Sequence, residues 1–381
     1  MADTTVTIKQ DGTGDYTTIG SAVAAANVSS GYWKMEIQDS NTYNESITIS
    51  TASTTSSNYV WLTVASSHRH QGVSATSGHA RLTNSSYPLT LNSDYARVEY
   101  LELLGSGSNA LRVQNGCDNG LVSRCVISGT SVGAVAYIFP IGTFSMDNCV
   151  VHGGTTNTLQ VWANYDVDLN IDFCSIMGGA DYALRAESPG VNTLACRSDI
   201  YNTALAPTDN ASISTSGWGA SGNGSWTHNG SHNAWDDDTS YFSSASGSYT
   251  NSQDIPYGNV TTTTTTANAM IVTSTSGNGN FTPVEATGSG SNLVLGNGTN
   301  RQGSEPDSRQ DFSTDIRGAA RPTAAGKIDI GAFQITTVAG FKYYNGSNFV
   351  DTTAVQYYNG STWVDVTGIQ YWNGSAWTDP S

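Results

Sequence analysis

A repeat of about 24 residues, the size of one coil of a stacked solenoid, constrains the fold more than any other feature of the chain. The segments Arg124–Gly129, Asn148–Gly153 and Phe173–Gly178 each carry a cysteine at their second position. Each repeat holds three short stretches in which apolar and polar residues alternate. A unit this small cannot bury its own apolar face, so successive units must stack. The repeat therefore predicts an all-β chain folded as a parallel β-helix, with three strands in each coil.

The three cysteines of the repeat, Cys125, Cys149 and Cys174, are predicted to stack in the interior as free thiols. Cysteine behaves as a small buried apolar residue, and five cysteines in 381 residues are too few for a disulfide framework. No histidine lies near them at the spacing of a zinc site. We therefore expect neither a metal site nor a cofactor.

The two ends of the β-helix are predicted to differ from its coils. Residues 19–26 form the one good helical segment, with Thr17 or Thr18 as its N-cap, and this helix would cover the open apolar end of the stack. The predicted divisions are an N-terminal cap at 1–27 and a β-helix at 28–335, which is irregular and loop-rich from about residue 207. Within that region, the run Asp236–Asp238 lacks the spacing of a calcium loop, which favours a solvated loop.

The C-terminal tail, 341–381, contains three tandem repeats, in which the triplet Asn-Gly-Ser recurs at Asn345, Asn359 and Asn373. Asn-Gly between alternating aromatic segments is the strongest short signal for a β-hairpin. Three hairpins cannot form a full core alone, so their rings are expected to mediate assembly or anchoring, with glycan binding and a plain spacer as alternatives. The residues assigned to assembly or anchoring are Tyr343, Tyr344, Phe349, Tyr357, Tyr358, Trp363, Tyr371, Trp372 and Trp377.

Charge and hydropathy exclude several classes of partner. The net charge of −16 is unsuited to binding nucleic acid. The chain contains no run of 18 apolar residues, so no insertion into a membrane is predicted. The first residues lack the features of a secretory signal, and the sparse cysteines suit folding in a reducing cytoplasm. A polar chain with little lysine nevertheless has the composition of an extracellular protein. A virion protein that folds in the host cytoplasm and is released by lysis would satisfy both observations.

Both ends of the β-helix region resemble known proteins. Gln10–Ile19 resembles the opening of pectinesterase-like right-handed parallel β-helix proteins. The segments Asp315–Gly318, Arg321-Pro322 and Asp329–Phe333 resemble the closing segment of bacterial and phage β-helix proteins of the pectin-lyase superfamily, although Gln334 stands where an acidic residue usually follows. The tail repeats are similar to tandem modules at the C-termini of phage virion proteins. The resemblance implies a right-handed β-helix of the phage virion type.

The same resemblance argues against esterase activity. Pectinesterases carry their catalytic aspartate in the motif Gly-x-Val-Asp-Phe-Ile-Phe-Gly, and the nearest match here, Gly133–Pro140, has Ala136 at that position. The chain is therefore expected not to be an enzyme of this kind.

The second strand of each coil is predicted to carry outward side chains that suit a sugar. The outward series is Arg112, Ala136, Gln160 and Arg185, followed two positions later by Gln114, Ile138, Trp162 and Glu187. An aromatic platform beside polar donors and acceptors is typical of a glycan-binding face, and an ordinary solvated face is the alternative. The predicted glycan site comprises Arg112, Gln160, Trp162, Arg185 and Glu187.

A glycan-cleaving site needs two carboxyl groups about 5–10 Å apart, and Glu187 is the one clear carboxylate on this face. Turn residues Asp166, Asp168 and Asp181 are candidates for the second. Asp147 and Asp172 precede cysteines of the repeat and are interpreted as structural.

The sequence therefore predicts a non-enzymatic bacteriophage virion surface protein: a head decoration, fibre or spike component. It is expected to bind other virion proteins, to form a homo-oligomer, with a trimer favoured, and to recognise host glycans as a further role. The alternatives are a glycan-degrading tailspike enzyme and a bacterial surface adhesin.

Overall fold

The computed structural model describes residues 3–29, 31–72, 78–129, 133–178, 182–187, 194–206, 300–306, 308–323, 329, 332 and 334, and elsewhere only individual strands. The chain divides into two compact units, Met1–Gln334 and Ile335–Ser381.

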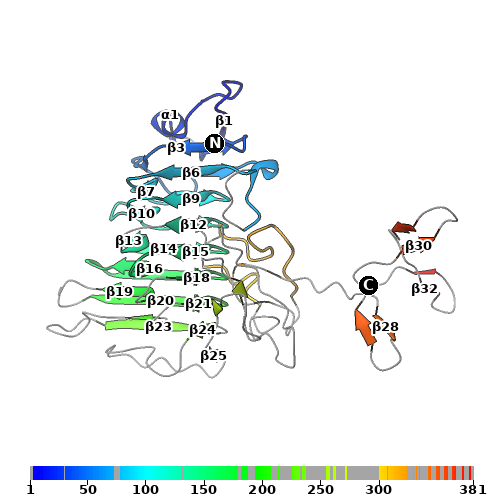
Figure 1. Ribbon diagram of the computed structural model, residues 1–381. Helices are drawn as coiled ribbons and strands as arrows, with labels where there is room; N and C mark the ends of the chain where they lie inside the picture. Colours follow the sequence, from blue (N-terminus) through cyan, green and yellow to red (C-terminus); the bar gives the residue numbers. More distant parts are fainter. Residues whose placement is uncertain are drawn as a thin grey trace. The chain divides into compact units, whose positions relative to one another are not determined.

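Three parallel sheets build the first unit, and consecutive strands of the chain pass from one sheet to the next (Figure 1). Sheet A contains β1 (Thr4–Ile8), β2 (Trp33–Ile37), β5 (Val60–Val64), β8 (Arg97–Glu99), β11 (Gly120–Ser123), β14 (Gly142–Asp147), β17 (Val167–Asp172), β20 (Ala195–Tyr201) and β23 (Ser225–Ser231). Sheet B contains β3 (Thr42–Asn44), β6 (Arg81–Asn84), β9 (Glu102–Gly105), β12 (Val126–Gly129), β15 (Val150–Gly153), β18 (Ser175–Met177), β21 (Ala204–Ala206), β24 (Ala234–Asp236) and β25 (Ile255–Tyr257). Sheet C contains β4 (Ile47–Ile49), β7 (Leu89–Leu91), β10 (Leu111–Val113), β13 (Ala134–Ile138), β16 (Asn157–Trp162), β19 (Tyr182–Glu187) and β22 (Ile213–Ser214).

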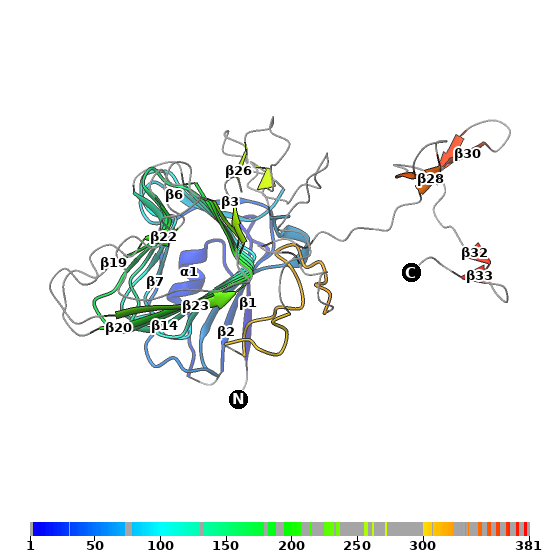
Figure 2. The same cartoon turned by 90° about the horizontal axis from the view of Figure 1, so that it is seen from below.

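Pairing is parallel between each strand and its equivalent in the next coil, as between β11 and β14 or β12 and β15. The fold is a parallel β-helix, as the repeat predicts, and Figure 2 views it along the stack. Alternate side chains of each strand point inward and stack on their equivalents, which closes a continuous core. Fully or almost fully buried ladders include Val98, Val122, Met146 and Ile171 in sheet A, Leu103, Ile127, Val151 and Ile176 in sheet B, and Leu89, Leu111, Leu159 and Leu184 in sheet C.

The cysteine ladder lies inside, at the corner where sheet A turns into sheet B. Cys125, Cys149 and Cys174 are fully buried free thiols. The Cys149 thiol lies 3.5 Å from the carbonyl oxygen of Val122, in the coil before it. Burial raises the pKa of Cys125 and Cys149 well above the usual thiol range, so no reactive thiolate forms there at neutral pH.

We therefore expect a soluble thiol reagent such as 5,5′-dithiobis(2-nitrobenzoate) to label none of these cysteines in the native protein at pH 8, and all of them in denaturant. The physical reason is the full burial of all three thiols, to which the raised pKa of Cys125 and Cys149 adds. Mass spectrometry of the labelled peptides reads the result. Rapid native labelling of the three thiols would contradict the ladder.

A left-handed backbone residue precedes each of the three cysteines and the equivalent residues Leu101 and Thr203 in the coils before and after them. Tyr100, Arg124, Asn148, Phe173 and Asn202 have φ of 59°, 51°, 51°, 52° and 50°. One residue in this conformation turns the chain sharply enough for sheet A to pass into sheet B without a loop. Asparagine tolerates the conformation, whereas other side chains pay about 1–2 kcal/mol for it, so packing around them must offset that cost.

Helix α1 (Ile19–Ala24) covers the N-terminal end of the core. Its N-cap is Thr18, whose hydroxyl accepts a hydrogen bond from the Ser21 amide at 3.1 Å. The Glu45 carboxylate accepts from the Ile19 and Gly20 amides at 3.0 and 2.9 Å, which ties the helix to the start of β4. Ile19 is fully buried, and the predicted capping helix is confirmed.

The described residues of the segment 300–334, called the strap below, return along the corner between sheets A and B (Figures 1 and 2). Arg309 donates to the carbonyl oxygens of Tyr95, at 2.6 Å, and Asn119, which belong to successive coils. Arg321 donates to Asn148 Oδ1 at 3.0 Å, and its guanidinium lies 4.1 Å from the centre of the Phe173 ring. Asn148 and Phe173, two of the left-handed corner residues, are thus part of the surface on which the strap packs.

Gln334, the residue that departs from the usual closing pattern, links two parts of the strap, at Asp315 and at Asp329. Its side-chain oxygen accepts from the Asp329 amide, and its side-chain nitrogen donates to Asp329 Oδ2, both at 3.1 Å. Its own amide donates to Asp315 Oδ2 at 3.0 Å. A neutral amide both donates and accepts at this place, whereas an ionised acid only accepts.

Each tail repeat forms a two-stranded antiparallel sheet. The pairs are β28 (Lys342–Tyr344) with β29 (Phe349–Asp351), β30 (Gln356–Tyr358) with β31 (Trp363–Asp365), and β32 (Tyr371–Trp372) with β33 (Trp377–Thr378).

Between the β-helix and the strap, the structure describes only strands, including the parallel pair β26 (Thr261–Thr262) and β27 (Ile271–Val272). Of the acidic run expected there, Asp237 and Asp238 lie outside the described residues. No helix in the described part has the length and hydropathy needed to cross a membrane.

Candidate glycan-binding face

The outer face of sheet C brings most of the predicted glycan site together. Arg112, Tyr137, Gln160 and Arg185 are successive partners across β10, β13, β16 and β19. Trp162 pairs with Glu187 two positions further along. All of these side chains are half-buried, so they form a shallow face and not an enclosed pocket.

The predicted outward positions of Ala136 and Ile138 are wrong. Both residues are fully buried, and Ala136 pairs with Leu111 and Leu159 in the core ladder. A uniform period would pair Leu111 with Val135. In the structure, the coil before β13 is slightly longer than the average and the coil after it is slightly shorter, so Leu111 pairs with Ala136. Since side chains alternate, a slip of one position reverses every residue of the strand. Tyr137 therefore takes the outward position and adds a ring that the sequence analysis missed.

Glu187 is held by two neighbours. Gln160 Nε2 donates to Glu187 Oε2 at 2.6 Å, and Arg185 forms an ion pair with Glu187 Oε1. The Glu187 side chain retains 15 % exposure and that of Arg185 28 %. With an arginine at one oxygen and an amide donor at the other, the carboxylate is held in a fixed orientation. This arrangement suits a fixed polar group that accepts ligand hydroxyls.

Arg112 stands apart from the other arginines. Its guanidinium carbon lies 4.8 Å from the centre of the Tyr87 ring. Of the arginines in the described part, it alone has no hydrogen bond or ion pair to another described residue. Burial raises the pKa of the neighbouring Tyr137 hydroxyl, with Arg112 opposing that rise, which keeps the phenol neutral.

No second carboxylate joins Glu187 within the strands β7, β10, β13, β16 and β19. Asp168 is exposed on β17 and pairs with Thr143 and Arg197, which places it on sheet A. Asp166 is exposed just before β17, and Asp181 lies outside the described residues.

Asp147 and Asp172 do not contribute to this face. Both are fully buried at the ends of β14 and β17, beneath the strap.

A buried charged cluster on the outer face of sheet B was not anticipated. Glu102 is fully buried and pairs with His79 and with Arg81, whose Nε lies 2.8 Å away. His70 packs edge-on against His79, with ring centres 6.1 Å apart, and burial lowers its pKa to about 4. The described residues contain no group of three or more side chains placed to hold a metal ion. Glu102 lies between the core residues Leu101 and Leu103. This charged residue between two leucines is the one sequence signal that could have revealed the cluster.

On sheet A, near the N-terminal end of the stack of coils, Trp61 is the centre of a cluster of charged side chains. Lys34 and Arg97 lie 5.0 and 4.5 Å from the Trp61 ring centre, from the strands on either side of it. Trp61 also donates to Glu99 Oε2 at 2.9 Å. These protein contacts already occupy the surroundings of the ring.

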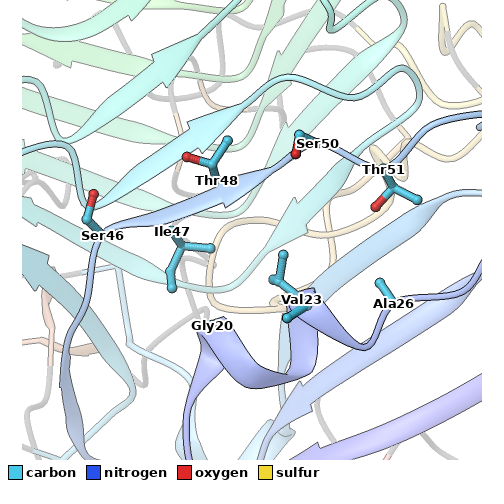
Figure 3. Close-up of a pocket in the computed structure, with 9 residues that line it drawn as sticks. Gly20, Val23, Ala26, Ser46, Ile47, Thr48, Ser50 and Thr51 are labelled. Carbon is cyan, nitrogen blue, oxygen red and sulfur yellow. The ribbon is translucent and has the colours of Figure 1, made fainter.

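A cavity of about 450 Å³ lies between α1 and β4. Its lining combines small apolar side chains with hydroxyls, and it includes no charged or aromatic side chain. In Figure 3, Val23 and Ala26 of the helical segment face the strand that carries Ile47. The cavity therefore lacks the groups that acid–base chemistry or ring stacking requires.

Comparison with known proteins gives structural likeness alone. The chain matches no protein-family model, and no curated protein matches it. Among solved structures, a pectin methylesterase from carrot shares 17 % identity over 67 % of this chain and 77 % of its own, with a TM-score of 0.40. A pectin methylesterase from Aspergillus niger gives 14 %, 66 %, 83 % and 0.41 for the same quantities. The pectate lyase Pel9A gives 12 %, 88 %, 98 % and 0.42. Likeness of this extent carries no inference about the chemistry of this chain.

Proposed function

We propose that the chain is a non-enzymatic surface protein of a bacteriophage virion, a head decoration, fibre or spike component. It binds host glycans on the outer face of sheet C and attaches to the virion or to its own copies through the tail repeats.

The glycan-binding role rests on one observation above all: Glu187, Gln160 and Arg185 form a bonded polar network beside Trp162. Sugars present apolar ring faces edged by hydroxyls, and such a face combines a flat aromatic surface with fixed donors and acceptors. The guanidinium of Arg112, which has no ion pair among the described residues, and the ring of Tyr137 extend this face across four strands. The network is pre-organised, so few side chains must be ordered when a ligand binds.

The alternative of a glycan-degrading tailspike enzyme receives less support from the same face. Glu187 is engaged by two donors, and its strand neighbours bring no second carboxylate within the described part of sheet C. Ala136, the residue aligned with the esterase aspartate, is an inward core residue. A bacterial adhesin would use the same face, and only the location of the protein separates it from a virion component.

Trp162→Ala is expected to weaken binding to the host surface polysaccharide at least about 30-fold, the scale of a lost aromatic anchor. The matched control is Trp61→Ala, which removes a half-buried tryptophan from sheet A and should leave the affinity within about twofold. Titration calorimetry with polysaccharide purified from the host strain measures both, and analysis of the incubated polysaccharide by size-exclusion chromatography monitors cleavage. Equal losses in the two variants would refute the sheet C site, whereas shortened polysaccharide would favour the enzyme.

A further inference from the structure

Two buried carboxyl groups lie side by side beneath the strap. Asp147 and Asp172 are paired in the register of β14 and β17, and adjacent strands lie about 4.8 Å apart. Both residues have no exposed surface. Two carboxylates so close in a fully buried site cannot both ionise without a large electrostatic cost.

Their hydrogen bonds are divided unequally. Asp147 accepts from Ser123 Oγ at 2.7 Å, from Asn148 Nδ2 at 3.0 Å and from Gln310 Nε2, in the strap, at 3.3 Å. Asp172 Oδ1 accepts from the strap residue Arg301, through Nε, at 3.2 Å. Asp172 Oδ2 has no hydrogen-bond partner among the described residues. We therefore assign the proton of the carboxyl pair to Asp172 Oδ2.

The surrounding cations neutralise only part of this charge: Arg301 forms an ion pair with Asp172 Oδ1. Arg124 lies 3.1 Å from Asp311 and 3.9 Å from Glu99, so its charge is shared with other carboxylates. Burial raises the pKa of Asp172 to about 7, with Arg301 opposing the rise and with Asp147 and Asp199 adding to it. Burial also raises the pKa of Asp147. The titratable or charged groups around the pair are Glu99, Arg124, Asp199, Tyr201, Arg301, Asp311, Asp315, Arg321 and Asp329.

We propose that the strap is a pH-dependent clasp, which closes over a single proton held by the carboxyl pair Asp147–Asp172. When the strap opens, water reaches both carboxyls and their pKa values return to the ordinary range near 4. Closing therefore takes up a proton between about pH 4 and pH 7. The stabilisation of the closed strap is complete at low pH and is lost as the pH rises through the pKa of Asp172 in the closed state.

The linkage predicts that the ratio of open to closed strap rises on the order of 10²-fold between pH 5 and pH 8. Hydrogen exchange of strap peptides within 301–323, corrected for the intrinsic pH dependence of exchange, measures this ratio. The amides of β2 and β5 serve as an internal reference, because they report unfolding of the β-helix itself. Asp172→Asn keeps the acceptor for Arg301 and cannot ionise, so its strap protection should not change between the two pH values.

Asp168→Asn is the matched control, since it removes an exposed carboxylate from the same strand and should leave the wild-type pH dependence in place. The proposal is overturned if strap protection in the wild type does not change with pH, or if Asp172→Asn keeps the full change. It is also overturned if the reference strands lose protection together with the strap, because the strap would then not open separately. Should Asp172→Asn fail to fold, Asp172→Ser removes the same titrating carboxyl and gives the same reading.

Discussion

Arg321→Ala is expected to lower the free energy of unfolding of the β-helix by about 3–5 kcal/mol, the usual cost of removing one partner from a buried charged network. Arg321 has 4 % of its surface exposed. Its guanidinium joins Asn148 to the Phe173 ring and reaches the Asp329 carbonyl at 3.4 Å. The substitution removes the hydrogen bonds that Arg321 donates to Asn148 Oδ1 and to the Asp329 carbonyl, and it weakens the closing segment at its centre.

Equilibrium denaturation in urea, followed by far-ultraviolet circular dichroism, measures this loss. Arg197→Ala is the matched control, because its side chain is 54 % exposed and its partner Asp199 belongs to the same strand. An exposed ion pair of this kind contributes about 0–1 kcal/mol. If both variants lost the same small amount, the strap would not be a stabilising element of the fold.

The proposed assembly role predicts that a chain without residues 340–381 is not incorporated into virions and is monomeric, while its β-helix stays folded. The compact unit Met1–Gln334 contains the core of the described residues, so we expect it to fold without the hairpins. The tail carries three tryptophans and five tyrosines, and a segment of about 40 residues is too small to bury them by itself. Each ring buried in an interface removes roughly 150–250 Å² from water.

Particle incorporation is measured by complementing a phage that lacks the gene, and oligomeric state by light scattering. The thermal unfolding curve of the truncated chain, compared with that of the full chain, controls for folding. Unchanged incorporation and an unchanged oligomer would refute the assembly role. Glycan binding through Trp363, Trp372 and Trp377 would then be the better hypothesis for the tail.

The general architecture could be read from the sequence because each coil repeats the same local rules. Cys125 and Cys149 mark one corner, and Thr18 caps the one well-formed helix. The register of β13 could not be read in the same way. A longer coil before this strand and a shorter coil after it compensate for one another. An average period therefore predicts where the coil lies, but it assigns Ala136 and Tyr137 each to the wrong face of the sheet.

The path of the strap also escaped a reading based on periodicity. Its partners, such as Tyr95 for Arg309 and Asn148 for Arg321, are 214 and 173 positions away in the sequence. Local spacing carries no information about such pairs. The left-handed corner at Arg124 was equally hidden, because arginine has no preference for that conformation and the strap contacts supply the reason for it.

These long separations have a consequence for the order of folding. Each coil contacts the coil directly before it in the chain, so coils form in sequence at a low entropic cost. The hydrogen bonds of the strap to the coils reach residues such as Asp172 and Tyr95, which lie 129 and 214 positions earlier in the chain. Loop closure over such distances is entropically costly. A ribosome releases the strap only after the coils that form its binding surface. The strap is therefore the final piece to dock, and a newly made chain passes through a state in which the carboxyl pair still faces water.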